Sequence, residues 1–166
     1  MSQEKSALDL YFEAHPRMVP DVGCYVGTGW EPAVLHALEL IRSLSEETGI
    51  WVQPRQIKEK LGSLRFYVQV MATDKVEEEE DDTEILEMLR AKGFEIPPAP
   101  PRPVIPVVSS ELLASVRQRV GAIVRQAEET TSQLCENCGA PEERMSRLRG
   151  YICRRCPACI DAGDPR

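Results

Sequence analysis

The chain has 166 residues, of which 42% are hydrophobic, and carries a formal net charge of −7 at pH 7. This length accommodates one ordinary domain and a small appendage. The sequence has no run of about 18 apolar residues, which excludes a transmembrane helix, and its N-terminus lacks the apolar region of a secretory signal. We therefore expect a cytoplasmic protein whose cysteines stay reduced.

The N-terminal residues predict a short helix followed by a glycine-rich turn. Residues 1–20 show the pattern of an amphipathic helix that is broken at Pro16. The segment 21–30 contains Cys24 and three glycines, whose spacing does not fit the dinucleotide-binding pattern. We interpret this segment as a turn that leads into the next helix.

A well-marked helix is predicted over residues 31–47. Thr28 and Glu31 have the spacing of a capping box, in which each side chain accepts a hydrogen bond from a backbone amide of the other residue. Apolar residues then recur at helical spacing, and Gly49 is a C-terminal stop signal.

Residues 50–70 predict an antiparallel hairpin that turns at 61–63. The second strand, 64–70, alternates apolar and polar residues, so one face of the hairpin packs on the preceding helix. The polar face is either a binding surface or an ordinary solvated sheet face. Its candidate binding residues are Lys58, Lys60, Arg65 and Tyr67.

The negative charge is concentrated after the hairpin. Residues 77–95 hold nine acidic and two basic side chains, so the rest of the chain is formally neutral. The acidic run 77–82 predicts the start of a short helix that ends at Gly93, because acidic residues are favourable at a helix N-terminus. Six prolines within 97–106 predict a semi-rigid spacer, although its pattern also fits an SH3 ligand.

The longest predicted helix starts at Ser109 or Ser110 and extends to about Ser132. Apolar residues recur in it at steps of three and four. This face either packs on the hairpin or pairs with a second copy of the chain. Its members are Leu113, Val116, Val120, Ile123 and Ala127.

Two C-x2-C pairs separated by 17 residues give the strongest signal in the chain. Four-thiolate zinc sites have this spacing, because two residues between cysteines let a tight turn direct both sulfurs at one ion. Four protein ligands close the coordination sphere, so we expect a structural Zn²⁺ rather than a catalytic one. Neither a disulfide framework nor a redox motif fits as well. The predicted ligands are Cys135, Cys138, Cys156 and Cys159.

Cys153 offers an alternative ligand, because it forms a further C-x2-C pair with Cys156. Only 14 residues separate it from Cys138, just outside the usual interval, so Cys159 is preferred. The same region is rich in arginine. Four arginines are candidates for a binding surface: Arg147, Arg149, Arg154 and Arg155.

The order of these motifs resembles a family of uncharacterised small proteins of bacteria and their phages. Segment 27–30 is similar to the G-D-G-W helix start of that family, and 56–67 to its Q-V-K-E-K-F-G-x-L-R-F-Y hairpin. Cys135-Glu-Asn-Cys-Gly139 and the second cysteine pair are similar to its zinc-ribbon-like end.

The resemblance covers roughly residues 27–70 and 120–160. The chain departs from the family at Tyr151, where Trp is usual, at Leu61, where Phe is usual, and by the insertion 73–108. The resemblance implies the architecture, the metal and a phage or mobile-element setting. It implies no activity.

We therefore expect an α+β fold in which a helix packs on an antiparallel hairpin and a long helix leads to a C-terminal zinc ribbon. Its expected parts are a helix–hairpin domain (1–72), a linker (73–108), the long helix (109–134) and the zinc-ribbon-like module (135–166).

No nucleophile and base pattern is recognised, and an acidic run cannot by itself hold a catalytic metal in fixed geometry. The chain is thus expected to be a non-enzymatic interaction module that binds a protein partner, such as a host or defence protein. The alternative is nucleic-acid binding through the arginines of the ribbon and the Arg65 and Tyr67 face. The acidic net charge counts against this alternative.

Overall fold

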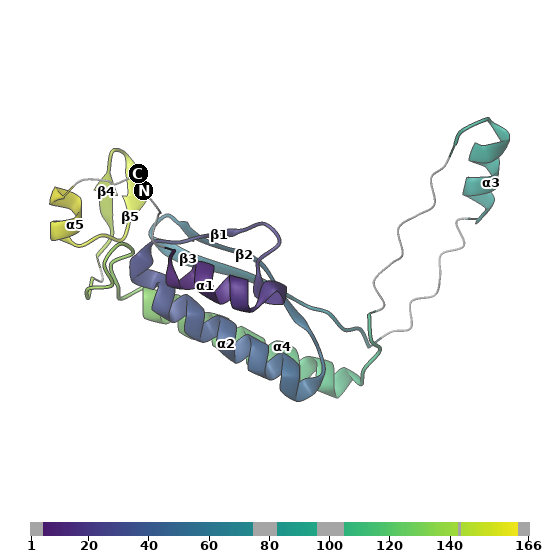
Figure 1. The fold of residues 1–166 in the computed structure, drawn as a ribbon, viewed down its shortest axis with the longest axis horizontal. Coiled ribbons are helices and arrows are strands. Elements are labelled where there is room, and N and C mark those ends of the chain that lie inside the picture. Colours follow the sequence, from purple (N-terminus) through teal and green to yellow (C-terminus); the bar gives the residue numbers. More distant parts are fainter. Residues whose placement is uncertain (1–4, 75–82, 96–104, 143, 163–166) are drawn as a thin grey trace.

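The computed structural model describes residues 5–74, 83–95, 105–142 and 144–162. It is a mixed α+β fold with a three-stranded sheet, a long helix and a small two-stranded sheet near the C-terminus (Figure 1). The predicted acidic run 77–82 and most of the predicted proline spacer lie outside the described residues.

The chain begins with the short helix that the sequence predicted. Helix α1 (Ala7–Ala14) starts at Ser6, whose hydroxyl accepts a hydrogen bond from the Asp9 amide at 3.1 Å. A 3₁₀ turn, η1 (Pro16–Met18), follows directly, so the predicted break at Pro16 is confirmed.

The central sheet has the order β1-β2-β3. Strands β2 (Val52–Lys60) and β3 (Ser63–Val70) form the predicted antiparallel hairpin. Strand β1 (Cys24–Tyr25) adds a short parallel edge to β2, within the segment that the sequence predicted as a turn. Only two residues pair there, and a strand that short leaves no alternating pattern in the sequence.

Helix α2 (Glu31–Thr48) follows the 3₁₀ turn η2 (Thr28–Trp30) and ends at Gly49, which has a φ of 70°. The predicted capping box is wrong, because α2 has no side-chain cap at its N-terminus. The Thr28 hydroxyl instead donates to the Asn137 carbonyl at 2.7 Å. A contact from far along the chain has replaced the local one.

Helix α4 (Ser110–Thr131) packs against both α2 and β3, which resolves the choice between packing within the chain and pairing with a second copy. It begins as predicted, with the Ser109 hydroxyl accepting from the Leu112 amide at 3.2 Å. Helix α3 (Thr83–Ala91) is also present and is followed by Gly93 with a φ of 84°.

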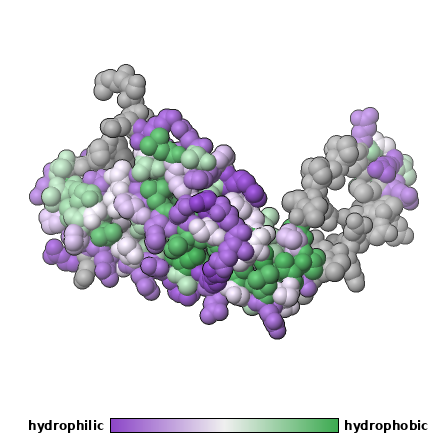
Figure 2. Space-filling view, turned by 60° about the horizontal axis from the view of Figure 1, so that its bottom comes forward, coloured by the Kyte–Doolittle hydropathy of each residue, from purple (hydrophilic) through white to green (hydrophobic). Residues whose placement is uncertain are grey.

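Helices α2 and α4 lie side by side and cover one face of the sheet (Figure 1). The core lies between them and the strands. Its residues include Leu38, Ile41, Ile57, Leu64, Phe66, Leu113, Val116 and Val120. Apolar side chains also gather on one part of the surface (Figure 2). Val107 and Leu112, which precede and begin α4, are among the exposed apolar residues.

The C-terminal module comprises residues 133–142 and 144–162. It contains the antiparallel strands β4 (Ser146–Leu148) and β5 (Tyr151–Cys153) and the one-turn helix α5 (Pro157–Asp161). No helix in the described part of the chain combines the length and apolar character needed to cross a membrane.

Candidate functional site

The structure brings together the four cysteines predicted as ligands. The sulfur atoms of Cys135, Cys138, Cys156 and Cys159 all lie within 4.8 Å of one another. The Sγ atoms of Cys138 and Cys156 are 3.6 Å apart. Sulfurs at the corners of a tetrahedron around zinc are separated by about 3.8 Å, given a Zn–S bond of about 2.3 Å. The four side chains therefore have the chemistry and the spacing to hold a metal ion.

Each C-x2-C pair is held in a tight turn by its own backbone. In the first, the Cys135 amide donates to the Ala140 carbonyl at 2.8 Å, and the Gly139 amide donates to the Cys135 carbonyl at 2.9 Å. In the second, the Cys159 amide donates to the Cys156 carbonyl at 3.0 Å at the start of α5. These turns direct both sulfurs of each pair at the four-cysteine cluster.

Polar hydrogens are directed at the sulfur atoms. The Cys156 amide donates to Sγ of Cys135 at 3.3 Å, and the Asn137 side-chain amide donates to Sγ of Cys159 at 3.4 Å. Burial raises the pKa of the Cys135 thiol, but backbone amides, the Cys156 amide foremost, lower it by more, to about 7. The site thus favours a thiolate at Cys135, the form that binds metal.

The other two cysteines lie away from this cluster. Cys153 is buried on β5, where its Sγ lies 3.7 Å from the Ser146 carbonyl, and burial raises its pKa. Cys24 lies on β1, and burial, followed by the charges of Glu31 and Asp9, raises its pKa to about 12. Both are kept as neutral thiols.

The first cysteine turn is seated on the glycine-rich segment before α2. The Gly29 amide donates to the Glu136 carbonyl at 2.9 Å, and the Trp30 indole donates to the Leu134 carbonyl at 2.9 Å. A Cβ at Gly29 would lie 2.3 Å from the Cys135 carbonyl oxygen, so no larger residue fits. The sequence indicated only a turn here, because nothing local identifies a partner that is about 100 residues away.

The C-terminal module also contacts the turn between β2 and β3. Arg154, which is buried, donates from Nε to the Gly62 carbonyl at 3.2 Å. A Cβ at Gly62 would lie 2.3 Å from Sδ of Met145. The module is therefore fixed to the helix–hairpin core at two separate places.

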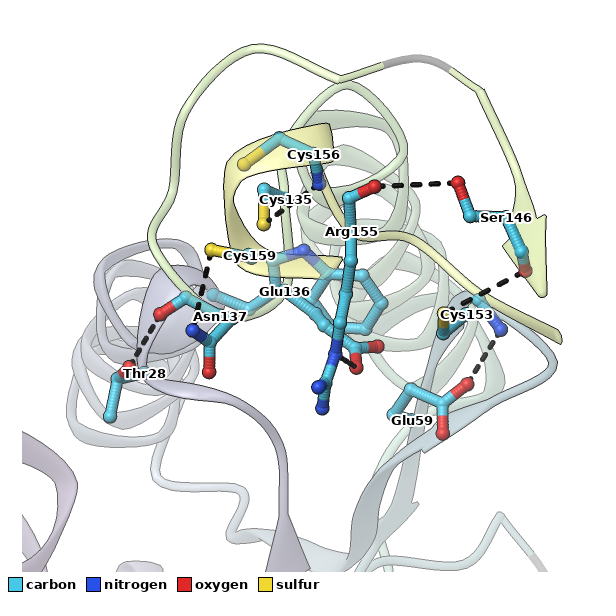
Figure 3. A network of polar contacts seen from close by, with 12 residues as sticks. Thr28, Glu59, Cys135, Glu136, Asn137, Ser146, Cys153, Arg155, Cys156 and Cys159 are labelled. Carbon is cyan, nitrogen blue, oxygen red and sulfur yellow. Dashed lines mark hydrogen bonds and ion pairs between the residues drawn. The ribbon is translucent and has the colours of Figure 1, made fainter. Parts of the chain in front are cut away.

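Glu136 and Arg155 form a buried ion pair beside the cysteines (Figure 3). Nε of Arg155 donates to Oε1 of Glu136 at 2.8 Å, and the two side chains are only 4% and 5% exposed. The second carboxylate oxygen, Oε2 of Glu136, is buried and accepts no hydrogen bond from a described residue. Buried carboxylate oxygens normally have such partners, which makes this atom notable.

A cavity of about 570 Å³, the hairpin cavity, lies between the β2–β3 turn and the β4–β5 hairpin, and Glu136 and Arg155 are among the residues that line it. Its lining residues are Glu59, Leu61, Glu136, Arg147, Leu148, Arg149, Gly150, Tyr151, Ile152, Cys153 and Arg155.

Both turns that border the hairpin cavity are two-residue loops with a strained first residue. Leu61 has a φ of 54° and Arg149 a φ of 49°, and a glycine follows each of them. Asparagine, aspartate or glycine is preferred at this position, because other residues pay a steric cost of about 1–2 kcal/mol there. Both strained side chains line the same cavity.

The predicted binding residues fall into three groups. Lys58, Lys60, Arg65 and Tyr67 lie on one face of the β2–β3 hairpin, where Nζ of Lys58 is 6.0 Å from the centre of the Tyr67 ring. Arg147 and Arg149 are exposed at the hairpin cavity. Arg154 and Arg155 are buried, so they support the C-terminal module from within and do not add to an exposed basic surface.

No protein-family model, no curated protein and no solved structure matches this chain. The resemblance to a family of phage and bacterial proteins therefore stays a prediction.

Proposed function

We propose that the four-cysteine cluster binds one structural Zn²⁺ and that the C-terminal module is a zinc ribbon. The two cysteine turns, the antiparallel strands between them and the inter-sulfur distances support this assignment. All four ligands come from the chain, so the bound ion would have no open position for a substrate. Its role is to hold the β4–β5 hairpin against the β2–β3 turn.

We further propose that the chain is a non-enzymatic module whose hairpin cavity and rim bind another protein. The observation that carries this proposal is the pair of strained turn residues, Leu61 and Arg149, at the same cavity. Strain that local sequence changes could relieve is retained mainly at functional sites.

The composition of the rim supports a protein as the ligand. Tyr151 is 79% exposed and Leu61 is 59% exposed, and Arg147 and Arg149 lie beside them. Exposed tyrosine and arginine around an apolar depression are the residues that dominate protein–protein binding energy. The resemblance to phage proteins favours a host or defence protein as the partner.

The test is affinity capture from the native source, followed by identification of the partner and measurement of its binding as a purified protein. Tyr151→Ala and Arg149→Glu are expected to weaken that binding at least tenfold. Their matched controls are Tyr25→Ala and Arg117→Glu, which change exposed residues elsewhere. If the test variants and their controls lose partner affinity equally, the proposal is contradicted.

A parallel salt titration examines the nucleic-acid alternative. Each phosphate contact would add about −0.9 to the slope of log affinity against log salt on duplex DNA. Tight binding of this kind that depends on Arg147 and Arg149 would replace the protein partner as the proposed ligand.

A further inference from the structure

We infer that strand β3 accepts an extended segment of another protein as a fourth strand of the central sheet, and that acidic and apolar side chains alternate in this segment. The segment lies in a groove between β3 and helix α4, the β3 groove. The residues that line this groove are different from those of the hairpin cavity, and the inference does not depend on the proposed function.

Strand β3 is the long open edge of the central sheet. Within the described residues it pairs with β2 alone. The Ile57 amide of β2 donates to the Gly23 carbonyl, on the β1 side, at 3.1 Å, and Phe66 lies directly opposite Ile57. Opposite residues of an antiparallel pair direct their backbone groups either toward each other or both away, so the N–H and C=O of Phe66 point out from the edge. The same holds for Leu64 and Val68, two residues to either side, and such groups are a template for a further strand.

Helix α4 extends beyond this edge of the sheet. Helices α2 and α4 lie side by side on one face (Figure 1). Two helices cover a width of about 20 Å, whereas three strands cover about 14 Å, and the difference is close to the width of one strand. Because α4 is the helix that packs on β3, the uncovered width lies at the β3 edge.

The β3 groove provides the space for this strand. It has a volume of about 720 Å³ and is lined by residues 66–70 of β3 and by Gly121 and Val124 of α4, among others. Gly121 keeps the groove open, because a Cβ there would approach only the end of the Arg125 side chain, at 3.4 Å. Val68 and Val124 are only partly buried, so apolar side chains of an added strand would complete their burial.

The solvent face of β3 favours acidic side chains on the added strand. Arg65 lies directly opposite Lys58 on β2, and like charges in that arrangement are destabilising. A carboxylate on the other side of Arg65 would compensate this repulsion. Side chains of a strand alternate between the two faces, so acidic residues on the solvent face alternate with apolar residues beneath α4.

The neighbouring segments of this chain are poorly suited to the groove. Five prolines within 97–103 precede Ile105, which lines the groove, and proline has no N–H to donate to β3. The acidic run 77–82 contains no apolar side chain to pack beneath α4. A second copy of β3 would bring its own α4 over the same edge, where strand axes about 4.8 Å apart leave too little room for helix axes that need about 8–10 Å. A strand of a different protein remains.

The test uses the full-length protein with its metal and the peptide acetyl-Glu-Val-Glu-Val-Glu-Val-Glu-amide. Antiparallel pairing is the more stable arrangement, and it directs the valine amides at β3 and the glutamate amides at solvent. A peptide N-methylated at its three valines should therefore bind at least about tenfold more weakly than one N-methylated at three glutamates, because it loses several hydrogen bonds. A peptide with lysine in place of glutamate should bind least. NMR titration, followed at the Phe66 and Val68 amides, measures all the affinities.

Gly121→Leu assigns the binding to the groove. The leucine side chain would occupy the space beneath α4, and we expect the affinity for the unmethylated peptide to fall at least about tenfold. Ala122→Leu is the matched control, since Ala122 is exposed on the same helix and does not line the groove, so this variant should keep the affinity. If Gly121→Leu does not fold, the two methylated peptides still decide on the unaltered protein.

Equal affinities of the two methylated peptides, or tighter binding of the valine-methylated one, would overturn the inference. Slow hydrogen exchange at the Phe66 and Val68 amides of the free protein would also overturn it, because the edge would then be already occupied. Protection that is independent of protein concentration would identify a segment of this chain as the occupant, and protection that rises with concentration would identify a second copy.

Discussion

The six cysteines of the chain have three different environments, and this difference makes the metal assignment testable residue by residue. Four sulfurs form the cluster, Cys153 is buried on β5, and Cys24 lies on the edge strand β1. Only the clustered sulfurs can share one ion.

Cys138→Ser is therefore expected to reduce the zinc content from about one ion per chain to nearly none, because three thiolates and a serine hydroxyl bind zinc far more weakly. Cys24→Ser and Cys153→Ser should leave the zinc content near one. Metal analysis of protein purified under reducing conditions measures all three. Cys159→Ser should lose its zinc as Cys138→Ser does. If Cys153→Ser loses as much zinc as Cys159→Ser, the predicted ligand set is wrong.

Gly29→Ala tests the contact between the first cysteine turn and the segment before α2. The added methyl group would lie 2.3 Å from two backbone atoms, the Cys135 oxygen and the Gly139 nitrogen. Backbone cannot move as a flexible side chain can, so we expect a loss of about 2–3 kcal/mol in the free energy of unfolding, measured in urea.

Gly121→Ala is the matched control for this change. Gly121 lies inside helix α4, and the nearest atom to a new Cβ there is the end of the Arg125 side chain at 3.4 Å. The replacement should raise the free energy of unfolding by about 0.5–1 kcal/mol, because alanine is the better helix residue. If both variants have a lower free energy of unfolding, replacing glycine destabilises the protein at either position, and the close contact at Gly29 is not the cause.

At the scale of elements, the two hairpin turns are the places where the chain departs from what a stable turn prefers. Each is a two-residue loop whose second residue is glycine and whose first is Leu61 or Arg149. An ideal turn of this kind would carry asparagine at the first position.

Leu61→Asn and Arg149→Asn should each raise the free energy of unfolding by up to about 1 kcal/mol, because asparagine tolerates a positive φ. Both should also weaken partner binding, since the strained side chains line the cavity. Urea titration and the binding assay measure the two effects on the same variants. Leu10→Asn on α1 is the control and should lower stability slightly, because Leu10 is exposed but helical. If both turn variants are less stable than the unaltered protein, Leu61 and Arg149 are not strained, and the proposal of a binding site at these turns loses its main support.

At the scale of the whole molecule, the four-cysteine cluster connects regions that are far apart in sequence. The C-terminal module contains few buried apolar residues, and its fixed position depends on the cysteine turns and on the contacts with Gly29 and Gly62. The helix–hairpin core, by contrast, has its own packed interior between α2, α4 and the sheet.

Removal of zinc with a chelator should therefore unfold the C-terminal module and leave the helix–hairpin core intact. Amide hydrogen exchange measures both parts at once. The Gly29 amide, which donates to the Glu136 carbonyl, should lose protection, whereas the Ile57 amide, which donates to the Gly23 carbonyl, should keep it. Loss of protection at both amides would mean that the two parts unfold together.

The sequence by itself determined the features that depend on local periodicity and spacing. The stripe from Leu113 to Ala127 predicted helix α4, and the alternation from Leu64 to Val70 predicted strand β3. The intervals between cysteines indicated which four could meet, because a C-x2-C turn directs its sulfurs whatever the rest of the fold does.

Only the tertiary structure decided what depends on residues distant in the chain. Thr28 has the spacing from Glu31 that suits a cap for α2, yet its hydroxyl donates to the Asn137 carbonyl. Gly29 is needed because the Cys135 carbonyl approaches it closely. The sequence predicted Arg154 and Arg155 to lie on a basic binding surface, but both side chains are buried. The hairpin cavity is made by two turns about 90 residues apart, and local sequence carries no information about such a meeting because only packing brings the turns together.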